Sequence, residues 1–235
     1  MPGMERSTLS LVLPCYNEEE NVTYVVAEAL SWFDSAGHKG EVIAVDDGSK
    51  DRTREILEDI AKKDSRLRVV SHEKNQGYGL AIRLGADAAT MDNIAFVDSD
   101  GQFHISDLDL LLPHLKGYAF VTGRRRKRAD SFTRGMLGKV LGAMNVLALG
   151  LWVRDVNCGM KAFRRSVWPK IRPTHGVEKL FNTEMFLRLK QEKIPWKQVD
   201  VPHFPRRAGN PTGAKFYVIK RMFTELYEIR RNVKR

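Results

Sequence analysis

Cysteine is scarce in this chain of 235 residues, and so are long apolar runs. The two cysteines, Cys15 and Cys158, have neither the CxxC nor the Cys/His spacing of a zinc site, so we expect packed, reduced thiols. The longest apolar stretch, residues 136–153, is interrupted by a lysine and an asparagine, which disfavours a transmembrane helix. The residues around Arg6 show no apolar signal segment, and we therefore expect a cytoplasmic protein.

Two glycine-rich phosphate-binding motifs are also missing. The sequence has no GxxxxGK(S/T) loop, and the GxG at Gly77 has Ile82 where the third glycine of a dinucleotide-binding motif belongs. GTPase-like and dinucleotide-binding functions are therefore disfavoured. Internal repeats and low-complexity linkers are absent as well. A hydrophobic content of 43% is enough for one well-buried α/β domain.

Charge is distributed unevenly along the chain, whose net charge is +10. Residues 1–100 hold 11 Lys and Arg against 19 Asp and Glu, whereas residues 101–235 hold 28 against 10. The basic half predicts an anionic partner, such as nucleic acid, an anionic membrane surface or a phosphorylated substrate. The basic run Arg124 to Arg128 contains no aromatic residue for base stacking, which disfavours nucleic acid.

Short β-branched runs alternate with amphipathic stretches. Apolar residues at helical spacing predict helices, the first of which begins with a capping box formed by Asn17 and Glu20. The alternation predicts an α/β fold with a Rossmann-like, mostly parallel sheet flanked by helices. The runs predict strands at Leu9–Leu13, Val42–Val45, Leu67–Ser71, Ile94–Val97, Ala119–Thr122 and Gln198–Val201.

The end of the chain predicts an element of its own. Residues 214–235 combine an apolar stripe with lysines and arginines, and predict a basic amphipathic helix that follows a domain of residues 1–213. Such a helix can lie in a bilayer interface, or it can dock on the domain's own core with its charged face outward. The pattern favours neither alternative.

Polar side chains follow each of the first four predicted strands. Because the carboxyl ends of parallel strands form the ligand-binding edge of an open α/β sheet, we expect these clusters to converge. Each alone has an ordinary explanation as a cap or a turn, whereas four together indicate a ligand site. The clusters are Pro14 to Glu18, Asp46 to Ser49, Lys74 to Gly77 and Asp98 to Gln102.

Asp98 and Asp100 are the candidate metal ligands. Two carboxylates one residue apart at a strand end can share a cation, and the amide of Gln102 adds a third oxygen. Such a set suits Mg²⁺ or Mn²⁺, with substrate phosphate oxygens completing the shell. A DxD alone is a weak signal, because acidic turns produce the same pattern.

These motifs, in this order, resemble the family 2 glycosyltransferases of the GT-A fold, and are most similar to the polyprenyl-phosphate (dolichol-phosphate) sugar synthases. The similarity extends from about Leu9 to about Lys215. It rests on LVLPCYNEEENV, VIAVDDGSKDRT, EKNQGYGLAIRLGADAA, FVDSDGQF, GRRR, RDVNCGMKAF, FNTEMFLRL and VPHFPRRAGNPTGA.

The resemblance implies a nucleotide-sugar donor and a divalent cation, Mg²⁺ or Mn²⁺, bound by Asp98, Asp100 and Gln102. Arg124 and Arg134 would meet the acceptor phosphate, and with the two aspartates they are the implied catalytic residues. The implied donor-binding residues are Pro14, Tyr16, Asn17, Glu18, Asp46, Asp47, Asn75, Gly77, Asp98, Ser99 and Arg206.

The chain departs from its apparent relatives in three places. Gly138 stands where several have a serine, and Cys158 stands where many have a serine or threonine. The late RxxGxS motif is stretched to RAGNPT, so that Arg206 and Arg207 are alternatives for contacting the pyrophosphate.

The acceptor is either a polyprenyl phosphate or a saccharide hydroxyl. A phosphate nucleophile is largely ionised at neutral pH, whereas a hydroxyl needs a general base, for which Glu184 or Asp155 are the candidates. Glu184 is equally compatible with a solvent-facing position on a helix. The resemblance favours the lipid acceptor and a peripheral association with the cytosolic face of a membrane, with no nucleic-acid partner.

Overall fold

A computed structural model describes residues 8–126, 149–177, 180–208 and 216–232. Its centre is a seven-stranded sheet with the order β3-β2-β1-β4-β6-β5-β7. Among the strands that the described residues form, only β6 is antiparallel to its neighbours β4 and β5, so the predicted mostly parallel sheet is confirmed. The strands are β1 (Leu9–Cys15), β2 (Gly40–Asp46), β3 (Leu67–Ser71), β4 (Asn93–Val97), β5 (Phe120–Arg125), β6 (Met160–Arg164) and β7 (Trp196–Val201).

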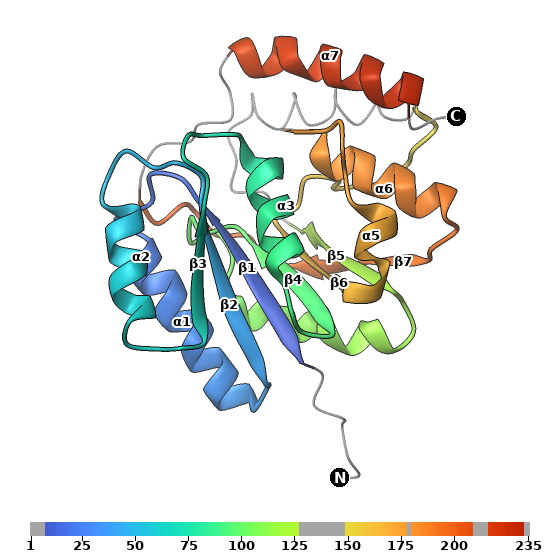
Figure 1. Cartoon of the computed structure of the whole chain (residues 1–235). Coiled ribbons are helices and arrows are strands. Elements are labelled where there is room, and N and C mark those ends of the chain that lie inside the picture. The colour runs from blue at the N-terminus through green and yellow to red at the C-terminus, as the bar shows by residue number, and fades with distance from the viewer. Residues whose placement is uncertain (1–7, 127–148, 178–179, 209–215, 233–235) are drawn as a thin grey trace.

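Helices cover both faces of the sheet (Figure 1). One apolar cluster joins the sheet to α1 (Val22–Ala36), α2 (Thr53–Ala61), η1 (Ile105–Leu110) and η2 (Leu112–Lys116). A second cluster, on the other face, joins it to α3 (Tyr78–Ala88), η3 (Arg165–Val167), α5 (Trp168–Ile171), α6 (Phe181–Gln191) and α7 (Phe216–Asn232). The result is a three-layer α/β/α domain.

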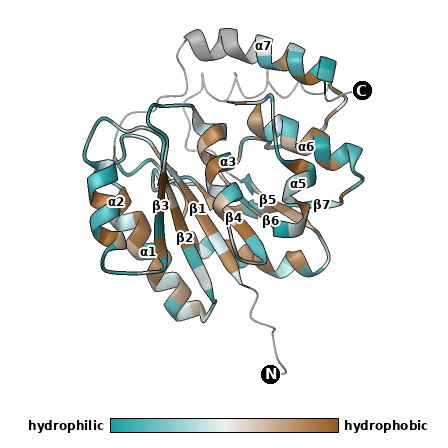
Figure 2. Ribbon diagram, viewed as in Figure 1, coloured by the Kyte–Doolittle hydropathy of each residue, from teal (hydrophilic) through white to brown (hydrophobic). Residues whose placement is uncertain are grey.

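Hydrophobic spacing explains how the helices meet the sheet. The predicted stripe of α1 is buried at Val22, Val25, Val26, Ala29 and Phe33. On α3, a Cβ at Gly85 would lie 2.4 Å from a methyl of Val12, so the glycine allows helix and strand to approach closely. Figure 2 shows the matching pattern, with hydrophobic strands enclosed by helices whose outer faces are hydrophilic.

The predicted capping box at Asn17 and Glu20 is wrong. Helix α1 begins at Val22, after Asn21, and Asn17 instead has a φ of 53°. Its side-chain oxygen accepts a hydrogen bond from the N–H of Lys50 at 2.8 Å. The side chain of Asn17 therefore binds the loop that carries Lys50 and does not cap α1. This partner is distant in the sequence, so the local pattern could not reveal it.

The described side chains of α7 include residues that dock on the domain. Ile229 is fully buried in the second apolar cluster, which also contains residues of α3 and α6, and Leu226 packs against the same cluster. The upstream part of the predicted stripe, residues 219–223, and Val233 lie outside the described side chains. In the part of the chain that the structure describes, no helix is long and apolar enough to cross a membrane.

Candidate functional site

The loops after β1, β2 and β4 touch one another at the carboxyl edge of the sheet. The hydroxyl of Ser99 donates to the carbonyl oxygen of Pro14 at 2.6 Å, which joins the loop after β4 to the end of β1. The backbone N–H of Asn17 donates to the hydroxyl oxygen of Ser49 at 3.0 Å, which joins the loop after β1 to the loop after β2. The expected convergence of these clusters is confirmed.

Asp47 brings the loop after β3 to the same edge. Its buried carboxylate accepts hydrogen bonds from the side chain of Asn75 at 3.0 Å and from the N–H groups of Gln76 and Gly77 at 3.0 and 2.9 Å. Gly77 has a φ of 105°, a conformation that favours glycine. The hydrogen bonds to Asp47 therefore fix the conformation of the loop after β3.

Asp46 and Tyr16 lie in the neighbouring turns. Asp46 is buried, and its Oδ1 accepts a hydrogen bond from the N–H of Ser49 at 3.1 Å. Tyr16 is partly exposed. Their implied roles in holding the base and ribose of a nucleotide stay predictions.

Asp98 is enclosed on two sides directly after β4. Its Oδ1 accepts a hydrogen bond from the hydroxyl of Tyr78 at 2.8 Å. A Cβ at Gly159 would lie only 1.9 Å from Oδ2, so the absence of a side chain there makes room for the carboxylate. The N–H of Asp98 also donates to the carbonyl oxygen of Gly159 at 3.1 Å.

Asp100 lies where negative charge is concentrated. Its Oδ1 accepts from the N–H of Gln102 at 3.1 Å. Burial and the charge of Asp98 together raise the pKa of Asp100 to about 7. The side-chain amide of Gln102 donates to the carbonyl oxygen of Phe204 at 3.2 Å, so residues after β7 cover this loop.

Arg206 and Arg207 have different partners. Arg206 forms ion pairs with Glu18 and, at 3.1 Å, with Asp100. The guanidinium of Arg207 instead lies over the ring of Tyr24, 4.0 Å from its centroid. Of the two alternatives, Arg206 is the one whose side chain pairs with the acidic edge, the part of the sheet edge that carries Glu18, Asp98 and Asp100.

The oxygen donors at this edge fit a hard divalent cation. A cation shared by Asp98 and Asp100 would favour the ionised form of both carboxylates and reverse the rise in the pKa of Asp100. Within the described residues, no group of three or more His, Cys, Asp or Glu side chains is arranged to hold a metal ion. A cation here would therefore need further oxygens from a ligand such as a diphosphate.

Arginines gather where β5 and β7 reach the same edge. Arg124 donates from Nε to Asp200 at 2.5 Å. This hydrogen bond, with the added charges of Arg126 and Arg154, lowers the pKa of Asp200. Arg134, the second implied acceptor residue, lies outside the described residues, as does Gly138.

Asp155, one of the two candidate bases, is buried and engaged. It accepts hydrogen bonds from the backbone N–H, Nε and Nη2 of Arg125 at 3.0, 2.9 and 2.7 Å. A carboxylate held by a charged guanidinium is a weak proton acceptor. Asp155 therefore anchors the turn before β6 to the end of β5.

Glu184, the other candidate base, is fully buried in the first turn of α6, and the solvent-facing alternative is wrong. It accepts hydrogen bonds from the N–H groups of Thr174, His175 and Gly176 at 2.9, 2.8 and 2.6 Å, and from Arg188 at 2.7 Å. Burial raises its pKa, but these hydrogen bonds outweigh burial and lower the pKa below its ordinary value. Glu184 is thus an anchor for the loop before α6.

Two polar residues near the edge were not among the predicted site residues. Tyr78 stands in GYGL, and no spacing pattern links it to Asp98. Lys161 is fully buried on β6, where Nζ donates to the carbonyl oxygen of Cys158 at 2.5 Å, and burial lowers its pKa to about 8. The one available signal was a lysine inside the apolar run GMKAF.

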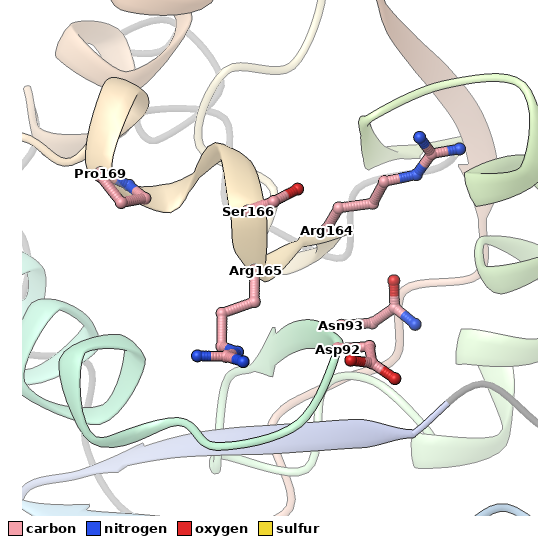
Figure 3. A pocket seen from close by; sticks show the side chains of 6 residues that line it. All are labelled: Asp92, Asn93, Arg164, Arg165, Ser166 and Pro169. Carbon is pink, nitrogen blue, oxygen red and sulfur yellow. The ribbon is translucent and has the colours of Figure 1, made fainter.

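A surface pocket of about 520 Å³ lies at the opposite end of β4, beside Asn93 (Figure 3). Its two arginines bond backbone carbonyls, Arg164 to Leu115 at 2.7 Å and Arg165 to Met91 at 2.8 Å. They hold loops together far from the acidic edge, and the pocket carries none of the predicted site residues.

Comparison with known proteins extends these findings. The profile described as Glycosyl transferase family 2 matches residues 10–172. A dolichyl-phosphate beta-glucosyltransferase of Drosophila melanogaster is 30% identical over 226 residues, which cover 85% of this chain and 69% of the relative. An undecaprenyl-phosphate 4-deoxy-4-formamido-L-arabinose transferase of Proteus mirabilis is 32% identical over 161 residues, covering 68% of this chain and 49% of the relative.

Solved structures give the same fold. A glucosyl-3-phosphoglycerate synthase from Mycobacterium tuberculosis, in complex with phosphoglyceric acid, matches with a TM-score of 0.68 at 25% identity, covering 94% of this chain and 80% of that chain. The same enzyme has been crystallised with Mn²⁺ and UDP-glucose, and that complex matches with a TM-score of 0.67. The chain spans about half to two thirds of the length of the curated relatives it matches.

Proposed function

The chain belongs to glycosyl transferase family 2, and from this premise we propose that it transfers a sugar from a nucleotide-sugar donor to a polyprenyl phosphate. The converging loops support the binding of a nucleotide-sugar donor. Residues after β1, β2 and β3 meet at the edge of the sheet that carries Asp98 and Asp100, where a nucleoside and its diphosphate would lie side by side. Relatives named as lipid-phosphate sugar transferases support the acceptor class.

The reaction is a single displacement. An oxygen of the acceptor phosphate attacks the anomeric carbon while the bond from that carbon to the diphosphate breaks, so the configuration inverts and the leaving nucleotide takes the electron pair. Asp98, Asp100 and Gln102 would hold Mg²⁺ or Mn²⁺, which supplies electrostatic stabilisation of the leaving group. Arg206, which pairs with Glu18 and Asp100, carries a positive charge at the same edge that would attract the diphosphate.

The acceptor class is supported by one observation above all: both candidate bases are occupied. Asp155 is bound by Arg125, and Glu184 is bound by three backbone amides and Arg188. A hydroxyl acceptor would need a proton acceptor at the site. A phosphate monoester, with a second pKa near about 6, needs none and is attracted by basic residues such as Arg124.

We further propose that the protein works at a membrane surface. Tyr227 of α7 and Trp152 are large side chains with exposed fractions of 65% and 79%. Arg230 and Arg231 are exposed on the same helix as Tyr227. Aromatic and basic side chains of this kind favour the headgroup region of an anionic bilayer.

A donor and acceptor panel tests the proposal. Purified protein is incubated with radiolabelled UDP-sugars or GDP-sugars, Mn²⁺ and a polyprenyl phosphate, and the label extracted into organic solvent is counted. We expect transfer from at least one donor, abolished by EDTA and reduced at least about 100-fold in Asp100→Asn, a deficit of roughly 2.7 kcal/mol. Transfer to a soluble sugar with none to polyprenyl phosphate would instead establish a saccharide-extending enzyme.

A further inference from the structure

The carboxylate of Asp98 is fixed by residues from two separate elements. Tyr78, the first residue of α3, donates to Oδ1 at 2.8 Å. Gly159, directly before β6, leaves the space that Oδ2 fills and accepts the N–H of Asp98 at 3.1 Å. An ionised carboxylate has about four lone-pair sites, so both oxygens can still bind a cation while held in this way.

The position of Tyr78 is itself fixed on both sides. The N–H of Gly77 donates to Asp47 at 2.9 Å, and the N–H of Gly79 donates to the carbonyl oxygen of Val177 at 2.9 Å. A Cβ at Gly79 would lie 2.5 Å from the side chain of Phe181, so α3 packs closely on α6 at this point. The phenol of Tyr78 therefore reaches Asp98 from a rigid base.

We propose that Tyr78 and Gly159 form a cradle that positions Asp98, and that through Asp98 they set the affinity of this site for a divalent cation. The inference rests on the proposed metal-dependent transfer. It assigns to Tyr78 a positioning role, since the phenol touches the carboxylate and not the reacting atoms. Partners that orient a metal-binding carboxylate typically change metal affinity by about 10- to 100-fold when removed.

The phenol is well suited to this role, because a tyrosine hydroxyl is ordinarily protonated at neutral pH and can donate a hydrogen bond to the carboxylate. A hydrogen bond from a neutral donor to a charged acceptor is stronger than one between neutral groups, and its loss leaves the carboxylate free to rotate.

Two substitutions test the cradle from opposite sides. Tyr78→Phe removes only the hydroxyl, and Gly159→Ala places a methyl where Oδ2 of Asp98 now lies. The matched controls are Tyr227→Phe, at an exposed tyrosine, and Gly117→Ala, where a Cβ would meet nothing within 4 Å. Mn²⁺ binding to the full chain is followed by electron paramagnetic resonance, alone and with UDP or GDP. Nucleotide binding is measured separately in EDTA, and unfolding temperature in the absence of metal.

We expect Tyr78→Phe and Gly159→Ala each to weaken Mn²⁺ binding by about 10-fold or more. Tyr78→Phe should leave the metal-free nucleotide affinity within about twofold, and both controls should match the wild-type chain. Unchanged Mn²⁺ affinity in Tyr78→Phe, with a lower unfolding temperature, would show that Tyr78 merely ties α3 to β4 and would overturn the inference. A wild-type chain that binds no Mn²⁺ under any of these conditions would instead overturn the metal-dependent function itself.

Discussion

Lys161 places a positive charge inside the apolar layer between β4 and α6. Its Nζ lies 5.3 Å from the centroid of the Phe96 ring and has the Cys158 carbonyl as its hydrogen-bond acceptor. Burial lowers the pKa of Lys161 from 10.5 to about 8, so at pH 7 the folded chain holds an ammonium that would be better solvated in the unfolded chain. The side chain therefore opposes folding while it secures the turn that carries Gly159.

Replacing this lysine by an apolar side chain of similar length should stabilise the protein. We expect Lys161→Met to raise the free energy of unfolding at pH 7 by about 1–3 kcal/mol, since a desolvation cost of about 3 kcal/mol is removed and one hydrogen bond is lost. The folded pKa is below the unfolded one. The penalty is therefore complete below pH 8, and it fades as pH rises from about 8 toward 10.5.

Urea unfolding at pH 7 and pH 9.5 measures this difference. The gain of Lys161→Met should shrink at the higher pH, whereas Lys62→Met, at an exposed position of the chain, should change stability by less than about 0.5 kcal/mol at both. A Lys161→Met protein that is less stable than wild type at pH 7 would contradict the account.

At the scale of elements, the loop before α6 depends on Glu184. We expect Glu184→Gln to lower the free energy of unfolding by about 1–3 kcal/mol, because the charge-assisted bonds to three backbone amides and Arg188 are weakened. The folded pKa of Glu184 is below its ordinary value, so its contribution is present at neutral pH and is lost as pH falls through the folded pKa.

Thermal unfolding between pH 7 and pH 3 checks this expectation. The difference in unfolding temperature between the wild-type chain and Glu184→Gln should become smaller as the pH falls toward 3. Transfer activity measured well below the unfolding temperature should survive in the variant, since the proposed phosphate acceptor needs no base. A loss of about 100-fold or more in a folded Glu184→Gln protein would restore Glu184 as a catalytic base.

Hydrophobic patterning was sufficient to predict six of the seven strands and the face of α1 that meets the sheet. It missed β6, because Met160 to Arg164 include two basic residues, and a buried lysine reads locally as a surface residue. The place of Asp98 and Asp100 at the carboxyl end of β4 could be predicted, since both follow a buried apolar run, and their part in metal binding stays a prediction. The contacts of Tyr78, Glu184 and Asn17 could not, because each depends on a partner that only the folded chain brings near.

At the scale of the whole molecule, charge is segregated between the two halves of the sequence. Helix α2, in the acidic half, and helix α7, in the basic half, lie on opposite faces of the sheet (Figure 1). We therefore expect an anionic surface to contact the domain on the side of α7.

Liposome sedimentation tests the consequence. We expect the full chain to sediment with anionic liposomes at low salt and to be released as ionic strength rises. The double substitution Arg230→Glu/Arg231→Glu should weaken this binding about 10-fold or more, by roughly 1 kcal/mol for each basic residue lost near the surface. Lys62→Glu/Lys63→Glu makes the same change of charge in the acidic half and should have a much smaller effect. Equal losses in the two variants would exclude an oriented contact through α7.

The ion pair between Glu18 and Arg206 joins residues 188 positions apart in the sequence. Contacts of such separation close very long loops, and their entropic cost delays them until most of the chain is already in place. The acidic edge should therefore be among the last regions to gain protection from hydrogen exchange during refolding. A partly folded chain would lack this ion pair, so protection of the amides around Arg206 reports whether folding has been completed.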